Sequence, residues 1–232
     1  MPGAIGSIAW LAKNEKKVSA IKHGLVVAGV GDSGCFHYKK SRIGQAEIDR
    51  VVHQVLKHSG QKYEIHDFSP YGYDERQYCS PGFNLPVGSL TRTPHGMYPE
   101  YHTSADNLEF VKPDYLSDSL EKYLQVIRAV EGNRTYVNQY PKCEVRLGKR
   151  GLYRAVGGQT DQPLHELALL WVLNLSDGQH SLLDIVERSS LALDVIYPAA
   201  KILHERGLLV EAQSQSYARG TSGEVSNDHR VL

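Results

Sequence analysis

The pattern of apolar and polar positions in the first 133 residues predicts alternating strands and helices. Gly24–Val30 is a continuous apolar run rich in valine, which favours a strand buried on both faces of a parallel or mixed sheet. Tyr63–Phe68 alternates as a second strand would. Gln45–His58 and Pro113–Val130 instead carry apolar residues at helical spacing along one face. Residues 1–133 are therefore predicted to form an α/β domain.

Two further segments adjoin this pattern. Ile8–Lys13 predicts a short helix near the start, with Ser7 as its N-cap. Residues 134–160 lose the regular periodicity, contain Pro141 and end on a pair of glycines. We interpret them as a linker or hairpin between two domains.

Residues 161–211 return to a compact, mostly helical pattern. A first helix is stopped by Asp177-Gly178, Leu182–Glu187 gives a short second helix, and Asp194–Arg206 gives a third. The apolar strand Leu208–Val210 follows. This order resembles a winged helix. Residues 212–232 are polar without periodicity and are predicted to be a disordered tail.

A long stretch between the two amphipathic helices of the first domain, Tyr71–Leu108, is dominated by turn residues. Five prolines and four glycines occur in or beside it, and only Asn84–Leu90 resembles a strand. Its many tyrosines argue against disorder. Long ordered loops tend to carry function, although a packed loop without chemistry is the alternative.

Charge and composition narrow the classes of partner. The 232 residues carry no net formal charge, which gives no reason to expect a nucleic acid or an anionic membrane. Between Pro163 and Ala212, the predicted winged helix holds seven acidic and three basic residues, a net charge of minus four, which disfavours DNA binding and a transcription regulator. A role in protein contacts, such as a homo-oligomer through the winged helix, fits better.

The three cysteines are odd in number and lack the spacing of a metal site. They are interpreted as reduced thiols of a cytoplasmic protein. Lys39, Lys40 and Arg42 are interpreted as a solvated basic turn. Asp32 directly follows the predicted buried strand, where α/β sheets commonly place ligands, but a simple turn explains it equally well.

Three phrases resemble the zinc aminopeptidase and glutaminyl cyclase superfamily. They are GVGDSG after the buried strand, YDERQYCSPGFNLPVG, and YPEYHTSADNL. The closer resemblance is to bacterial aminopeptidase-like proteins that carry a C-terminal winged helix and accompany polysaccharide-biosynthesis genes. It covers roughly residues 2–211. The implied fold is part of a mixed-sheet, zinc-exopeptidase-like sandwich followed by the winged helix.

The resemblance implies a site that holds two zinc ions, with His102 as a ligand to one and Asp32 as a ligand to the other. Residues that would orient these ligands or line the substrate pocket are also implied: Asp74, Glu75, Arg76, Glu100, Tyr101 and Asp106. The superfamily's general base belongs to an adjacent Glu-Glu pair, which this sequence lacks. The base is therefore expected upstream of Met1.

The sequence is accordingly interpreted as the C-terminal part of a zinc-dependent aminopeptidase-like hydrolase, inactive on its own. Its substrate would be a small peptide, an aminoacyl group or an amino sugar, cleaved at an amide bond. The alternative is a non-catalytic aminopeptidase-like binding scaffold linked to polysaccharide metabolism.

Overall fold

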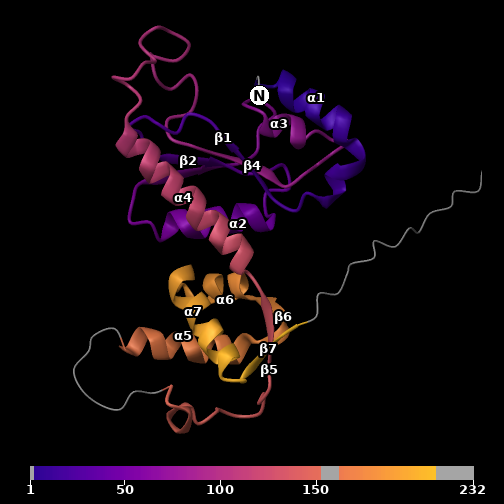
Figure 1. Ribbon diagram of the computed structural model, residues 1–232, viewed down its shortest axis with the longest axis vertical. Coiled ribbons are helices and arrows are strands. Elements are labelled where there is room, and N and C mark those ends of the chain that lie inside the picture. The colour runs from indigo at the N-terminus through magenta and orange to yellow at the C-terminus, as the bar shows by residue number, and fades with distance from the viewer. Residues whose placement is uncertain (1–2, 153–161, 213–232) are drawn as a thin grey trace, which may run out of the picture.

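The first domain is built on a four-stranded mixed sheet (Figure 1). The computed structural model describes residues 3–152 and 162–212. The strands are β1 (Gly24–Val27), β2 (Phe36–Lys39), β3 (Tyr63–His66) and β4 (Val87–Thr91), in the order β1-β4-β2-β3. β1 and β4 are parallel, β2 and β3 are parallel, and β2 runs antiparallel to β4.

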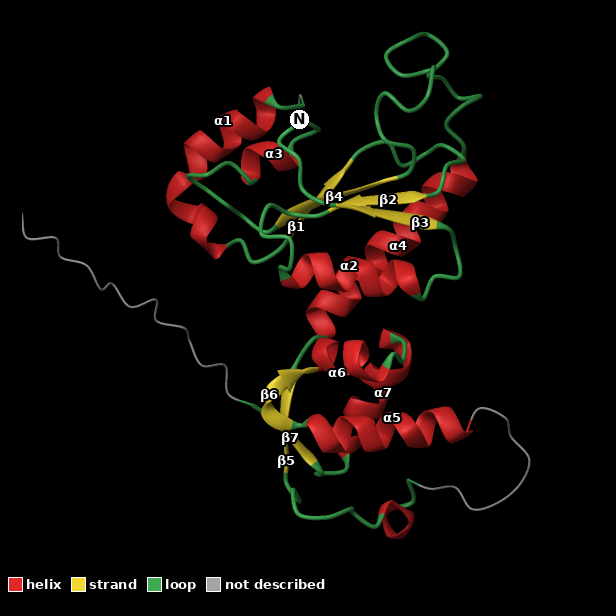
Figure 2. Ribbon diagram, turned by 180° about the vertical axis from the view of Figure 1, so that it is seen from behind, coloured by secondary structure: helices red, strands yellow, loops and turns green. Residues whose placement is uncertain are grey.

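One face of this sheet is covered by two amphipathic helices, α2 (Glu47–Lys57) and α4 (Pro113–Gly132) (Figure 2). Phe36, Tyr38 and Leu90 point from the strands into the core that these helices close. Since successive strand residues face opposite sides, His37 and Lys39 must face the other side of the sheet. That second face is polar, and it forms the floor of the candidate site described below.

A smaller apolar cluster lies beside β4. It joins α1 (Ile5–Asn14), the 3₁₀ helix η1 (Glu15–Ala20) and α3 (Glu75–Tyr78) through Leu11, Val18 and Cys79. Ser7, expected as an N-cap, lies inside α1, because the helix begins earlier than the apolar pattern suggested. Its side chain is buried and bonds to Ala4 O and Asp74.

Two predictions about strands were wrong. β1 ends at Val27 and lies at an edge of the described sheet, with Val27 61% exposed, so it is not buried on both faces. Lys39 is the last residue of β2 and not part of a solvated turn. Four residues with a basic end, FHYK, give too short a pattern to stand out as a strand.

The second domain has the elements of a winged helix: α5 (Gln162–Leu175), β6 (Asp177–Ser181), α6 (Leu182–Ser189), α7 (Leu193–Glu205) and β7 (Leu209–Glu211). Its sheet has the order β6-β5-β7, with both pairings antiparallel. The central strand is β5 (Thr135–Asn138), and the 3₁₀ helix η2 (Leu147–Arg150) follows it. Part of the expected linker is thus integral to the second domain. Residues 153–161 and the expected tail after Ala212 lie outside the described residues.

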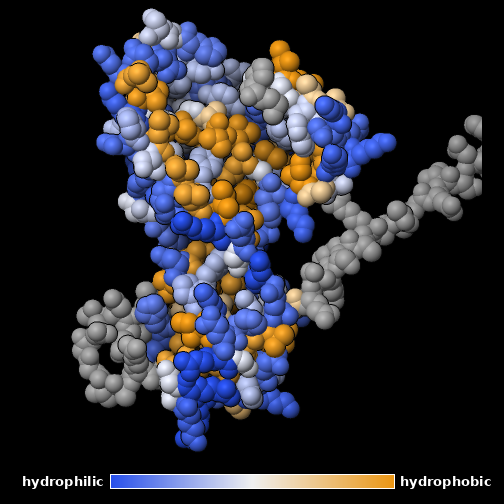
Figure 3. All heavy atoms as spheres, in the orientation of Figure 1, coloured by the Kyte–Doolittle hydropathy of each residue, from blue (hydrophilic) through white to orange (hydrophobic). Residues whose placement is uncertain are grey.

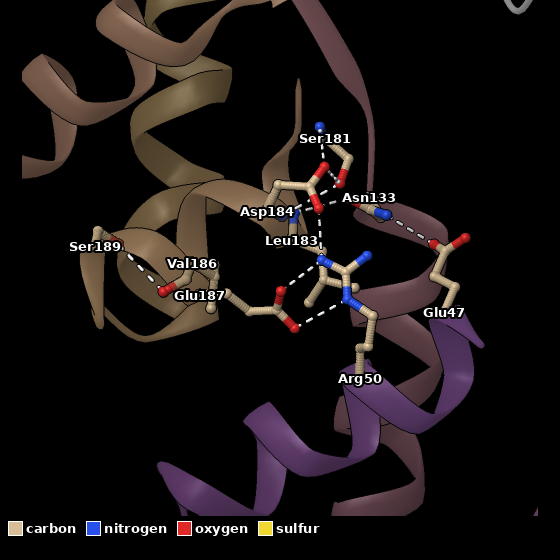
Figure 4. Close-up of polar contacts among 9 residues, drawn as sticks. All are labelled: Glu47, Arg50, Asn133, Ser181, Leu183, Asp184, Val186, Glu187 and Ser189. Carbon is tan, nitrogen blue, oxygen red and sulfur yellow. Dashed lines mark hydrogen bonds and ion pairs between the residues drawn. The ribbon is translucent and has the colours of Figure 1, made fainter. Parts of the chain in front are cut away.

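A polar joint holds the two domains together (Figure 4). From α2, Arg50 bonds to Glu187 through Nε and Nη2, at 3.0 and 2.6 Å, and to Asp184 at 2.5 Å. Asn133 bonds to Glu47 on one side and to the backbone N–H of Leu183 on the other. The Leu183 side chain is fully buried in the core of the first domain. The joint therefore combines ion pairs with apolar burial.

Among the described residues, no helix is both long enough and apolar enough to cross a membrane.

Candidate active site over the polar face of the first sheet

The polar face of the first sheet forms the floor of a cleft of about 620 Å³. His37 and Lys39 of β2, His66 of β3, and Ser89 and Thr91 of β4 line it from the sheet. Residues of the long loop, around positions 69–75 and 94–97, form its walls. A cleft of this size suits a small-molecule ligand.

A buried ion pair lies in this cleft. The side chain of Glu75 is completely buried, and its Oε1 contacts Lys39 Nζ and accepts the backbone N–H of Tyr73 at 3.1 Å. Lys39 also donates to the carbonyl of Tyr71 at 2.8 Å. Gly72 is needed here, because a Cβ would lie 2.3 Å from both Lys39 Nζ and Glu75 Oε1. The pair thus fixes the loop against the sheet.

Two polar atoms of the cleft are left without a partner. Glu75 Oε2 and Ser89 Oγ are both buried and form no hydrogen bond with the described residues. Buried polar atoms are nearly always satisfied in folded proteins, and exceptions call for an explanation. A polar ligand in the cleft would supply the missing partners.

Asp32 is held firmly at the end of the sheet. It is 3% exposed, and its Oδ1 accepts from Gly34 N at 2.8 Å, Thr93 Oγ1 at 2.6 Å and Thr93 N at 3.3 Å. Thr93 lies just beyond β4, so these bonds tie the turn after β1 to the adjacent strand. The carboxylate therefore has a fixed position, as a metal ligand needs.

His102 lies on the loop beyond β4, in an aromatic cluster. It adopts a left-handed conformation with φ of 59° and is exposed, and its ring stacks on Tyr101 at 4.0 Å between centroids. Tyr101 meets Tyr98 edge to face at 5.6 Å and lies 6.0 Å from His95. The cluster connects His102 to the wall of the cleft through His95, which lines it.

Tyr98 is the residue that relates the surroundings of Asp32 to those of His102. Burial raises the pKa of Tyr98, and the charges of Asp106 and Asp32 raise it further. The charge of Asp32 therefore acts on Tyr98, and the Tyr98 ring packs edge to face on Tyr101, the neighbour of His102. No hydrogen bond joins Asp32 to His102. Both are ordinary zinc donors, but catalytic zinc takes three protein ligands, so these two supply only part of a zinc site.

The other implied pocket residues separate into distinct places. Glu75 lines the cleft. Asp74 instead accepts hydrogen bonds from the Ala4 N–H and from Ser7 and so anchors α1. Arg76 lines a different hollow, with Arg42 and Phe68.

Glu100 and Asp106 stay in the loop that carries His102. Glu100 is half-buried and accepts from Thr103 through its backbone carbonyl, whereas Asp106 is exposed.

Sequence reasoning missed the polar strand residues His37, Lys39, Glu64 and His66. For β2, the signal that could have revealed them is the alternation in Phe36–Lys39, where Phe36 and Tyr38 face the core and the alternate residues His37 and Lys39 face the cleft.

The fold and cleft define a class of protein: a mixed α/β domain with a polar site on one sheet face, followed by a winged helix. Residues 134–211 match a winged helix-turn-helix family. Residues 1–133 match DUF4910, described as a domain of unknown function. The chain belongs to the DUF4910 family.

Two relatives from Clostridium acetobutylicum give further information. One is 53% identical over 208 residues, covering 90% of this chain and 48% of the relative, and its provisional name is a polysaccharide biosynthesis protein with an aminopeptidase-like domain. The other is a crystal structure of a protein provisionally named as a peptidase, 49% identical with a TM-score of 0.83, covering 91% of this chain and 47% of that one. The chain thus spans about half the length of these relatives.

These findings confirm the predicted fold class, a mixed α/β peptidase-like domain with a C-terminal winged helix. They also establish that the chain is related to aminopeptidase-like proteins.

Proposed function

We propose that this chain is part of a zinc-dependent aminopeptidase-like hydrolase that cleaves an amide or peptide bond, with the cleft over the first sheet as its substrate site. The observation that carries the proposal is the buried, half-satisfied carboxylate of Glu75 within the cleft. Its free oxygen is suited to bind the amino group of a peptide, an aminoacyl compound or an amino sugar. The relationship to proteins named for peptidase activity supports the same class of substrate.

The residues of this chain would have separate roles in binding zinc and substrate. Asp32, fixed by three hydrogen bonds, and His102, on the aromatic loop, would each provide a zinc ligand. Zinc bound there would polarise the scissile carbonyl and lower the pKa of a bound water. The remaining ligands and the general base would come from residues outside this chain. The Lys39–Glu75 pair would bind and orient the substrate by its charged end.

Surface features agree with a longer functional protein. The outer face of α4 exposes Leu116, Leu120 and Ile127, and the edge strand β1 exposes Val27. Figure 3 shows apolar side chains gathered over this part of the first domain. Together with relatives about twice as long, this surface supports a fold completed by further polypeptide that packs on it.

A second candidate function is a non-catalytic binding scaffold linked to polysaccharide metabolism. It is favoured because Asp32 and His102 alone supply too few ligands for catalytic zinc, and because one relative is named for polysaccharide biosynthesis. In this case the cleft would bind a small amino compound without cleaving it.

The test compares the 232-residue chain with the longest polypeptide encoded in the same reading frame. Both are assayed with zinc on a panel of aminoacyl chromogenic substrates. We expect no turnover by the chain alone, because Asp32 and His102 supply too few ligands for their zinc ions and no residue of the chain is assigned as the base, whose loss costs about 10²–10⁴-fold. We expect turnover by the longer protein that is abolished by Asp32→Asn and His102→Ala. Turnover that persists in both variants would contradict the ligand assignment, and no turnover by either polypeptide would favour the scaffold.

A further inference from the structure

The parallel pairing of β2 with β3 brings a second set of metal-ligating side chains together, apart from Asp32 and His102. In the register of these strands, His37 lies opposite Glu64 and Lys39 lies opposite His66. His37, Glu64 and His66 therefore project from the same face of the sheet, the one that forms the cleft floor.

Three atoms of this set form a small triangle. His37 Nδ1 is 2.9 Å from His66 Nε2 and 3.6 Å from Glu64 Oε2, and His66 Nε2 is 3.7 Å from the same Glu64 oxygen. Ligands about 2.0–2.1 Å from a tetrahedral zinc ion lie roughly 3.3–3.4 Å from one another. The three separations bracket this value, so one ion can be bound by these atoms once the His37 and His66 rings, now nearly parallel and hydrogen-bonded, turn their nitrogens toward it.

The surroundings suit an ion with an open position. The His37 side chain is 8% exposed, whereas those of His66 and Glu64 are 42% and 50% exposed, so the triangle is anchored on one side and open to solvent on the other. Cys35 Sγ lies 3.4 Å from His37 Nε2, the ring nitrogen that faces away from the triangle. A partner at the second nitrogen helps to orient a ligating histidine, and here that partner is a thiol in place of the more common carboxylate, carbonyl or water.

Charge also favours a cation. Two neutral imidazoles and one carboxylate carry a single negative charge, and Asp32 lies near enough to act electrostatically on His37. The nearby ammonium of Lys39 is already engaged with Glu75 and the carbonyl of Tyr71. Two nitrogens and one carboxylate form a ligand set typical of zinc with a water in the fourth position.

We propose that His37 Nδ1, His66 Nε2 and Glu64 Oε2 form a binding site for a first-row divalent cation of the zinc type. Imidazole ligands select zinc, cobalt or nickel over magnesium and calcium, which prefer oxygen alone. Because His37 and His66 line the cleft, the open coordination position faces the space where a substrate would bind. This site is independent of the zinc positions implied for Asp32 and His102.

The experiment titrates the untagged 232-residue chain with Zn²⁺ by calorimetry and with Co²⁺ by visible absorption. We expect one tight site whose Co²⁺ spectrum shows the intense visible bands of four-coordinate cobalt. His66→Gln and Glu64→Gln, both half-exposed, should weaken Zn²⁺ binding by at least about tenfold. Circular dichroism and thermal melts check that these variants are folded, so the test does not depend on the buried His37.

Two controls separate this site from its alternatives. His58→Gln removes an exposed histidine that directly follows α2, on the opposite side of the sheet, and should leave Zn²⁺ affinity unchanged. The double variant Asp32→Asn, His102→Ala should also keep the tight site. Absence of tight binding by the native chain, unchanged affinity in His66→Gln, or loss of the site in the double variant would each overturn the proposal. The first two results would leave His37 and His66 as a hydrogen-bonded pair that shares a proton.

Discussion

The cleft of the first domain and the joint between the domains both hold charged side chains, but only the cleft contains buried polar atoms without a hydrogen-bond partner among the described residues. At the joint, Arg50 is shared between Asp184 and Glu187, and none of these three side chains leaves a buried polar atom unpaired. In the cleft, Lys39 pairs with one oxygen of Glu75, while the second oxygen and the hydroxyl of Ser89 have no partner. A structural contact can satisfy its groups internally, whereas a binding site keeps groups for its ligand.

The largest effect is expected when the cleft pair is broken. Glu75→Ala leaves Lys39 without its carboxylate in a largely buried place, and removal of one partner of a buried pair costs about 3–5 kcal/mol. We expect the free energy of unfolding to fall by about 3 kcal/mol in denaturant titrations.

Two variants sharpen this result. Lys39→Met combined with Glu75→Leu removes both charges and should be clearly more stable than Glu75→Ala alone. Glu109→Ala, an exposed loop residue, should change the free energy of unfolding by less than about 0.5 kcal/mol. A Glu75→Ala variant as stable as the native chain would show that the pair is not a buried one.

A smaller effect is expected at the joint. Arg50→Ala removes ion pairs between side chains that are 26–34% exposed, worth about 1 kcal/mol. The two tryptophans lie in different domains, Trp10 in the first and Trp171 in the winged helix, so single-tryptophan variants report each domain separately. We expect coincident unfolding transitions in the native background and separated ones with Arg50→Ala. Transitions that remain coincident would mean that apolar packing at Leu183 alone couples the domains.

Acidification should also weaken the joint, because it protonates Asp184. Burial raises the pKa of Asp184, but its hydrogen bonds with Arg50 and Ser181 together outweigh this effect and hold the pKa below 3.8. A depressed carboxyl pKa stabilises the fold above pH 3.8, and this stabilisation is lost as the pH falls through the lower native value. Asp184→Asn should therefore reduce the pH dependence of stability between pH 5 and pH 2. An unchanged profile would argue against the assigned role.

No effect at all is expected when DNA is added. The exposed Lys201 of α7 lies 4.0 Å from Glu205, and residues 163–212 have a net charge of minus four, so little phosphate neutralisation is available there. We predict no shift of duplex DNA in gels at physiological salt. A shift that weakens steeply as the salt concentration rises would instead assign the winged helix to nucleic acid.

The sequence predicts what depends on local pattern. The periodicity of α2 and α4 and the helices of the winged helix are visible along the chain, and the family resemblance named Glu75 as one of several candidate pocket residues. The partner of Glu75 was not predictable, because Lys39 reaches it from a strand 36 residues earlier. The His37, Glu64 and His66 set depends on the register of two parallel strands, which no local pattern determines. β5 was missed for a similar reason, because its partners β6 and β7 lie far along the chain.

The central claim is that the cleft, and not the winged helix, binds the substrate. The most direct measurement is a backbone NMR titration of the 232-residue chain with zinc and then with an aminoacyl hydroxamate, a metal-binding mimic of an amino-acid substrate. We predict that the hydroxamate step changes the chemical shifts of β2, β3, β4 and the loop residues near Glu75 and His95. These hydroxamate-induced changes should be lost in the Lys39→Met, Glu75→Leu variant, which keeps His37, Glu64 and His66. Changes confined to the winged helix, or equal changes in that variant, would contradict it.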